Sequence, residues 1–108
     1  MKALDIEARG NDALAYLTGS DEQAADLKNA ADVADANYEA IVDALIVHGE
    51  GAMELRKASA RTSDAARQAK LDYLEAQRKY DAVANRRRSE ALVIEWCRSL
   101  YSNYRQGK

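Results

Sequence analysis

The feature that most constrains the fold is a run of more than forty residues, 63–105, that contains neither glycine nor proline. Within it, apolar side chains recur at alternating steps of three and four residues, the heptad pattern of a helix that packs along a partner helix. The inward positions are Ala66, Ala69, Tyr73, Ala76, Tyr80, Val83, Arg87, Glu90, Ile94, Cys97, Tyr101 and Tyr104. We expect one continuous helix here, whose apolar seam is interrupted at Arg87 and Glu90.

A second helical arm is expected before it, over about residues 21–48. Ser20 and Gln23 form a capping box at its start, and two carboxylates in the first turn interact favourably with the positive helix end. The inward series of this arm is Leu27, Ala31, Ala34, Tyr38, Ile41, Leu45 and His48. A turn at residues 49–51, which contains two glycines, then ends the helix.

The N-terminal residues are expected to form a separate, shorter element. Residues 1–10 are mixed in character and end in a glycine, so they predict a loose lead-in. A short helix is expected over about residues 12–18, ended by Thr18 and Gly19. Between the two arms we expect a turn with a short helix over residues 49–62, followed by the second arm.

These elements predict an all-α fold in one domain, residues 1–108, built as a long antiparallel helical hairpin that resembles a coiled coil. The absence of proline and the abundance of strong helix formers agree with this class. Because the first arm is shorter, the alignment leaves residues 89–105 as an overhang with a wide apolar face. A hairpin this long is not a compact single-core monomer, so we expect two copies to form a four-helix homodimer.

The net charge of -2 conceals a division along the sequence. Residues 1–60 carry 5 basic and 12 acidic side chains, whereas residues 61–108 carry 11 basic and 6 acidic ones. In an antiparallel hairpin the acidic arm lies beside the basic arm, and the facing charges favour that pairing. The alternative interpretation is a basic surface that binds a nucleic acid or an acidic partner.

Arg87 is the seam residue with the clearest expected partner. The antiparallel alignment places it near the start of the first arm, where Asp21 or Glu22 can accept a charge-assisted hydrogen bond. Such a polar layer fixes the register of two helices at some cost in stability. Arg87, Asp21 and Glu22 are therefore the candidate register residues.

The basic and aromatic residues near the C-terminus support a different hypothesis. Cations interleaved with aromatic rings hold single-stranded nucleic acid by neutralising phosphates and stacking on bases. The candidate contact residues are Arg86, Arg88, Trp96, Arg98, Tyr101, Tyr104 and Arg105. The three arginines 86–88 fan over about 200° of the helix and cannot all face one phosphate backbone. The aromatic residues fall mainly on the apolar face, so packing in a core is the competing interpretation.

The sequence contains no catalytic, cofactor-binding or metal-binding pattern, so we expect a non-enzymatic protein without a cofactor. His48 has no second His or nearby Cys, and we interpret it as a residue at the negative end of its helix. The single cysteine, Cys97, is expected to be buried and reduced. No stretch approaches the roughly 18 apolar residues of a membrane span, and the N-terminus lacks the apolar region of a secretion signal. We therefore expect a soluble, cytoplasmic protein.

Several segments spread over most of the chain carry a family resemblance. They are residues 11–17 (NDALAYL), the helix start at residues 20–22 (SDE), the glycine-containing turn and the closing run 88–100 (RSEALVIEWCRSL). Together they resemble small uncharacterised helical-hairpin proteins of tailed bacteriophages and prophages. The resemblance implies a phage accessory protein, often encoded near recombination and single-strand-DNA genes. It implies no catalytic residues.

Three hypotheses for function follow. The leading one is a dimeric hairpin that supports phage DNA recombination or replication by binding single-stranded DNA or a DNA-bound phage protein. The second is an inhibitor of a host enzyme or defence complex, with the acidic first arm or the apolar overhang as its contact surface. The third is a structural or assembly protein that associates with itself or with other phage proteins. No membrane partner is expected.

Overall fold

The structure is a computed structural model that describes residues 2–106 of the 108-residue chain. It contains three helices, which are α1 (Ala3–Val47), α2 (Met53–Thr62) and α3 (Asp64–Gln106). The part of the chain that the structure describes includes no strand, so the predicted all-α class is confirmed.

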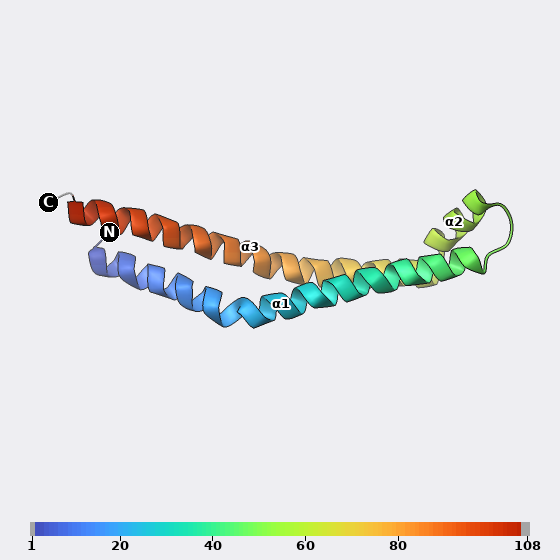
Figure 1. The fold of residues 1–108 in the computed structure, drawn as a ribbon, viewed down its shortest axis with the longest axis horizontal. Helices are drawn as coiled ribbons and strands as arrows, with labels where there is room; N and C mark the ends of the chain where they lie inside the picture. The colour runs from blue at the N-terminus through green and yellow to red at the C-terminus, as the bar shows by residue number, and fades with distance from the viewer. Residues whose placement is uncertain (1, 107–108) are drawn as a thin grey trace. The chain divides into compact units, whose positions relative to one another are not determined.

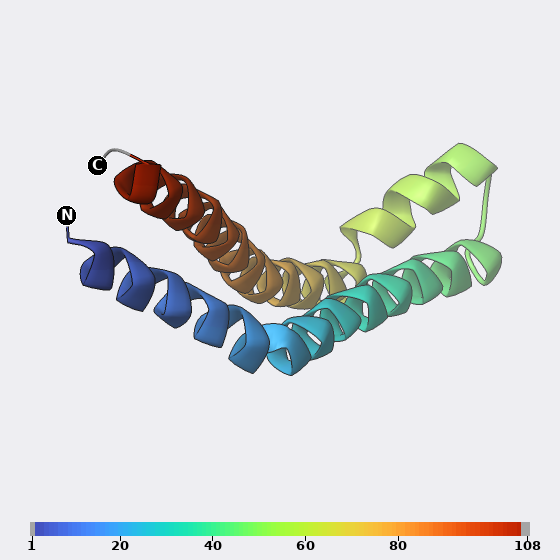
Figure 2. The ribbon, with the colours of Figure 1, turned by 60° about the vertical axis from the view of Figure 1, so that its left-hand side comes forward.

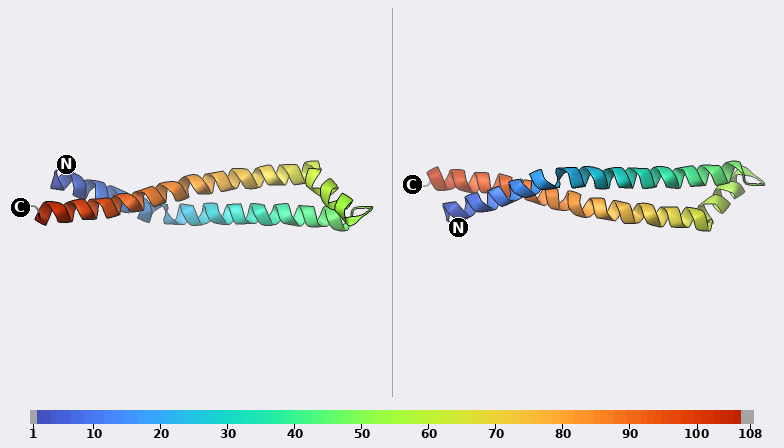
Figure 3. Two further views of the ribbon diagram at one scale, coloured as in Figure 1. Left: turned by 90° about the horizontal axis from the view of Figure 1, so that it is seen from above. Right: turned by 90° about the horizontal axis from the view of Figure 1, so that it is seen from below.

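The contacts divide the chain into two compact units, and each long helix contributes to both. Unit 1 combines residues 2–25, most of them in α1, with residues 81–106 of α3, and unit 2 comprises Asp26–Tyr80. In each unit the segments of α1 and α3 lie side by side and run in opposite directions (Figure 1 and Figure 3). The predicted helical hairpin is therefore confirmed within each unit.

α1 is a single helix of 45 residues, which corrects the predicted N-terminal boundaries. The loose lead-in at residues 1–10 was wrong, because the chain is helical from Ala3 onward. The separate short helix at residues 12–18 and the start of an arm at about residue 21 were also wrong. Ile6 is buried in unit 1, so tertiary packing stabilises a first turn whose sequence carries no strong start signal.

The predicted break at Thr18 and Gly19 does not occur. The hydroxyls of Thr18 and Ser20 instead make hydrogen bonds within α1. The hydroxyl of Thr18 donates to the Leu14 carbonyl at 3.0 Å, a bond made by residues inside a helix. Ser20 is buried, and its hydroxyl donates to the Leu17 carbonyl instead of accepting from the backbone as a cap does. A glycine within a helix lowers stability by about 1 kcal/mol relative to alanine. Burial of the neighbouring apolar side chains of α1 against α3 offsets this cost.

Unit 2 packs parts of all three helices around a small apolar core. Each helix supplies one buried residue: Val42 from α1, Ala60 from α2 and Ala66 from α3. Partly buried apolar side chains that pack against this core are Tyr38, Ile41 and Ile46. Because Ala60 belongs to α2, the short helix completes the core between the two long helices.

The inward face of α1 changes near its C-terminal end. Leu45 and His48, which were predicted to face inward, are exposed, whereas Val42 and Ile46 are buried or partly buried. A straight helix drifts about 20° per heptad, so the inward position moves to the next residue over several heptads. The contact with Ala60 of α2 favours this rotated face.

The predicted turn with a short helix at residues 49–62 corresponds to α2 and its flanks. Gly51 has a φ of +93°, a conformation that side-chain-bearing residues rarely adopt. The Arg56 Nε donates to the Gly51 carbonyl at 2.8 Å and holds this turn. Ser63 then caps α3, because its hydroxyl accepts a hydrogen bond from the Ala66 backbone at 3.2 Å.

α3 is one helix of 43 residues, close to the predicted second arm. The ten predicted seam positions from Ala66 to Cys97 are all buried or partly buried, whereas Tyr101 and Tyr104 are exposed. The predicted overhang of residues 89–105 was wrong, because the first turns of α1 lie beside this part of α3 (Figure 2). The cause is the continuity of α1 through Gly19.

Candidate functional site

The polar break in the α3 seam is a hydrogen-bonded layer in unit 1. The Arg87 Nη1 donates to the Leu17 carbonyl at 2.8 Å and to the Ser20 hydroxyl at 2.7 Å. Its Nη2 donates to the Asp21 carboxylate, with which it forms an ion pair. The structure therefore brings Arg87 and Asp21 together. It does not bring in Glu22, which is exposed and lies about 100° further round α1.

A second polar contact lies beside this layer. Arg9 donates from both terminal nitrogens to Glu90, at 3.0 and 3.3 Å, in a two-point contact between α1 and α3. Glu90 is only 13% exposed. The hydrogen bond from Arg9 holds the pKa of the Glu90 carboxyl below its usual range, and it raises the pKa of the Arg9 guanidinium in return. Both polar residues of the α3 seam, Arg87 and Glu90, therefore have hydrogen-bond partners on α1.

Sequence reasoning missed Arg9 because it lay in the predicted lead-in. A signal was present, however. The heptad positions of α1 at Leu17 and Ser20 extend backward through Ala13 and Gly10 to Ile6, and all five are buried or partly buried. Extending the seam in this way places the neighbouring arginine beside α3.

The three successive arginines of α3 serve three different contacts, as their fan of directions predicts. The Arg86 guanidinium lies 3.8 Å from the centre of the Tyr16 ring, a cation–π contact between the helices. Arg87 occupies the polar layer, and Arg88 donates to Asn85 on its own helix at 2.8 Å. Arg86 and Arg88 thus lie apart from each other and share no common ligand position.

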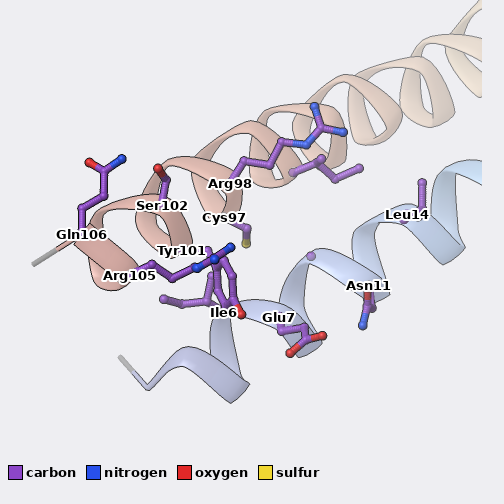
Figure 4. Close-up of a pocket in the computed structure, with 12 residues that line it drawn as sticks. Ile6, Glu7, Asn11, Leu14, Cys97, Arg98, Tyr101, Ser102, Arg105 and Gln106 are labelled. Atoms are coloured by element: carbon purple, nitrogen blue, oxygen red, sulfur yellow. The ribbon is translucent and has the colours of Figure 1, made fainter. Parts of the chain in front are cut away.

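A groove runs between the two helices of unit 1 near the chain termini (Figure 4). Its volume is about 730 Å³, within the size range of sites that hold small ligands or parts of larger ones. The apolar lining consists of Ile6, Gly10, Leu14, Ile94, Cys97 and Tyr101. The polar lining consists of Glu7, Asn11, Arg98, Ser102, Arg105 and Gln106. α1 and α3 approach closely at this point, since a Cβ at Gly10 would lie in ordinary contact, 3.5 Å from that of Cys97.

Three of the candidate contact residues lie together on the α3 wall of this groove. They are Arg98, Tyr101 and Arg105. Figure 4 shows Arg105 beside Tyr101 between the helices, whereas the Arg98 side chain extends along α3 away from α1. The Arg105 guanidinium lies 5.9 Å from the centre of the Tyr101 ring, and this ring is partly exposed to solvent. Arg98 forms an exposed ion pair with Glu95 at 3.6 Å, a contact that solvent weakens and that a ligand anion can replace.

The other four candidate residues do not line the groove. Arg86 is stacked on Tyr16, and Arg88 bonds to Asn85, as described above. Trp96 and Tyr104 are exposed but belong to other parts of the α3 surface. The seven residues therefore do not form one continuous surface, and it is the groove that combines two of these cations with an aromatic ring and a concave shape.

Other chemistry finds little support among the described residues. No group of three or more His, Cys, Asp or Glu side chains there is placed to hold a metal ion. Cys97 is a buried free thiol beside Gly10. His48 follows α1, and its backbone nitrogen donates to the Ala44 carbonyl at 3.0 Å. Across residues 2–106, no helix has the length and apolar character needed to cross a membrane.

No protein-family model, curated protein or solved structure matches this chain. The fold defines the class, an all-α helical hairpin.

Proposed function

We propose that the protein is a non-enzymatic binding protein that holds single-stranded DNA in the groove of unit 1. In this proposal it is an accessory to phage DNA recombination or replication in the bacterial cytoplasm. The observation that supports it best is that Arg98, Tyr101 and Arg105 of α3 all line one open groove.

The spacing of these residues suits a nucleic-acid strand. Arg98 and Arg105 are two helical turns apart, about 10 Å along α3, with Tyr101 between them. A base can stack on the partly exposed ring while neighbouring phosphates meet the two guanidiniums. Stacking of this kind accepts any base, because every base has a π-face.

The opposite wall of the groove favours one orientation of the strand. Glu7 repels phosphates from the α1 side, whereas Asn11 can exchange hydrogen bonds with base edges there. The apolar lining contributed by Leu14 and Ile94 excludes water from bases that enter the groove. The strand is therefore expected to bind with its backbone along α3 and its bases toward α1.

Fluorescence anisotropy with a labelled oligothymidine tests the proposal. Binding at about 50 mM salt should weaken as salt rises, with a logarithmic slope of about -1.4 for two neutralised phosphates on a single strand. The double variant Arg98→Ala with Arg105→Ala should remove most of that slope. The matched control, Arg78→Ala with Lys79→Ala, also removes two positive charges, but from unit 2, where both groups pair with Glu75. It should bind nearly as the parent does. Absence of binding at about 50 mM salt, or an equal loss in the control, contradicts the proposal.

A pull-down from bacterial lysate separates this proposal from the two competing hypotheses. DNA binding predicts co-purifying proteins that disappear after nuclease treatment. An inhibitor of a host enzyme or defence complex predicts one dominant protein that resists the nuclease. A structural or assembly role predicts self-association or association with phage proteins alone.

A further inference from the structure

One face of α3 in unit 1 is exposed although it is strongly apolar. Leu92 is 66% exposed and Trp96 is 49% exposed, and both lie on the side of α3 that does not contact α1. Val93 and Leu100, which extend this surface, are only partly buried. We call the surface the outer face. Its members are Ser89, Leu92, Val93, Trp96, Ser99, Leu100 and Asn103.

The outer face carries no charge. At 100° per residue its members occupy a sector of about 120° on α3. Every charged side chain of α3 between residues 85 and 106 lies outside this sector: Arg86, Arg87, Arg88, Glu90, Glu95, Arg98 and Arg105. An acidic or basic partner would therefore find no complementary charge here. A second copy of the same face, by contrast, would meet no like charge.

The order of residues along the outer face is nearly the same in both directions from Trp96. Four residues away on either side are Leu92 and Leu100. Seven residues away on either side are the small polar residues Ser89 and Asn103, whereas the residues three away, Val93 and Ser99, differ in character. In a two-fold symmetric contact, residues at equal distances before and after the axis meet each other. This face therefore matches itself when two copies run antiparallel.

We propose that the outer face is the interface with a second copy of this chain, with α3 packed antiparallel on α3 and the two-fold axis at Trp96. Leu92 then packs against the second copy's Leu100, and the two Trp96 rings meet in offset or edge-to-face contact at the axis. Ser89 lies opposite the second copy's Asn103, where the side chains can exchange hydrogen bonds. The contact extends over about 20 Å of helix.

This interface does not use the alanines of the two helix seams. Ala31, Ala66 and Ala69 are fully buried within the chain itself, so their close helix approach is used between α1 and α3. The outer face remains available because α1 covers a different side of α3. The proposal is independent of DNA binding, because the outer face includes none of the residues that line the groove.

Sedimentation equilibrium tests the proposal. The parent protein should be a dimer at micromolar concentration, and Leu92→Lys or Trp96→Glu should weaken dimerisation more than about thirtyfold, as removal of a central contact does. Leu71→Lys is the matched control, because Leu71 is an equally exposed leucine of α3 that lies in unit 2. It should remain dimeric. Helix content by circular dichroism should be the same in all four proteins, since the changed side chains are exposed. A monomeric parent at about 50 µM, or a control that dissociates as much, overturns the proposal.

Disulfide trapping tests the antiparallel orientation. In a Cys97→Ala background, a mixture of Ser89→Cys and Asn103→Cys proteins should cross-link mainly as the mixed pair. Equivalent positions 89 lie about 20 Å apart in the proposed dimer and cannot bridge. Predominant cross-linking of like with like would overturn the antiparallel arrangement. Binding of labelled oligothymidine by the Leu92→Lys monomer distinguishes loss of the dimer from loss of the DNA site.

Discussion

The two units use the same two helices but hold them together by different chemistry. In unit 2, Val42, Ala60 and Ala66 form an apolar core, and Lys70 of α3 lies 4.9 Å from the centre of the Tyr38 ring of α1. In unit 1 the seam contains two ionic contacts that link α1 to α3. Apolar packing tolerates many registers, whereas a hydrogen-bonded arginine tolerates few. We infer that unit 1 sets the register of the hairpin and unit 2 supplies nonspecific apolar stability.

The largest effect is expected from enlarging a side chain in unit 2. Ala66 is completely buried, so Ala66→Leu should overpack the core and destabilise the protein by about 3 kcal/mol. The neighbouring Ala65 is exposed, and Ala65→Leu should change stability by less than about 0.5 kcal/mol. Urea denaturation followed by circular dichroism measures both. Equal effects would mean that unit 2 is not tightly packed.

Removing the arginine of the polar layer should have the next largest effect. Arg87→Met keeps a long apolar chain but leaves the buried Ser20 hydroxyl without its charged donor, and it should cost about 2 kcal/mol. Arg88→Met is the control, because Arg88 is exposed and bonds only within its own helix among the contacts described. A stabilised Arg87→Met protein would show that the layer opposes folding, as some buried ion pairs do.

Alanine substitutions at Gly19 in α1 and at Gly51 in the turn should have opposite effects on stability. Gly19 is helical with open space around it, so Gly19→Ala should stabilise the protein by about 1 kcal/mol. Gly51→Ala should destabilise it by about 1 kcal/mol, because φ at this position is +93°. Thermal denaturation gives the sign of each change. A destabilised Gly19→Ala protein would contradict an uninterrupted α1.

The pH dependence should be the smallest of these effects. The pKa of Glu90 is lowered in the folded protein by the hydrogen bond from Arg9. Its contribution to stability is therefore complete above the ordinary glutamate pKa of about 4.3 and is lost as pH falls through the lowered pKa. Glu90→Gln should remove this part of the acid destabilisation, as measured by urea midpoints between neutral and acidic pH.

Glu75 provides the control for that titration. The hydrogen bond from Arg78 also lowers the pKa of Glu75, but Glu75 lies in unit 2 and is 52% exposed. Solvent screens such a pair, so Glu75→Gln should change the acid destabilisation less than Glu90→Gln does. The reverse order would contradict the assignment of ionic register control to unit 1.

The sequence predicted α3 better than α1 for a physical reason. The α3 seam is a long heptad series, and packing along a partner reinforces that pattern at every turn. In α1 the local signals at Ser20, Gln23 and Gly19 pointed to a helix boundary, but burial of the seam on both sides outweighed them. Local capping signals could not reveal this, because the stabilising contacts come from a distant part of the chain.

In the groove, too, the residues from α3 were easier to predict than those from α1. Three of its α3 residues, Arg98, Tyr101 and Arg105, were among the predicted contact residues, because cationic and aromatic side chains can be recognised in the sequence. Its α1 residues include Ile6, Gly10 and Leu14. They were missed because the sequence did not predict that the N-terminal part of α1 packs on α3. The Arg87 and Asp21 contact could be anticipated, since it required only the antiparallel alignment of two heptad series.

The most direct test of this account is amide hydrogen exchange at residues 7–19 of the intact protein. The groove, the polar layer and the continuous α1 all require this segment to be helical and packed on α3. We predict that these amides are protected from exchange, with protection continuing across Gly19 into the following residues. Exchange at the rate of an unfolded peptide up to residue 19, followed by protection from Ser20 onward, would contradict the account.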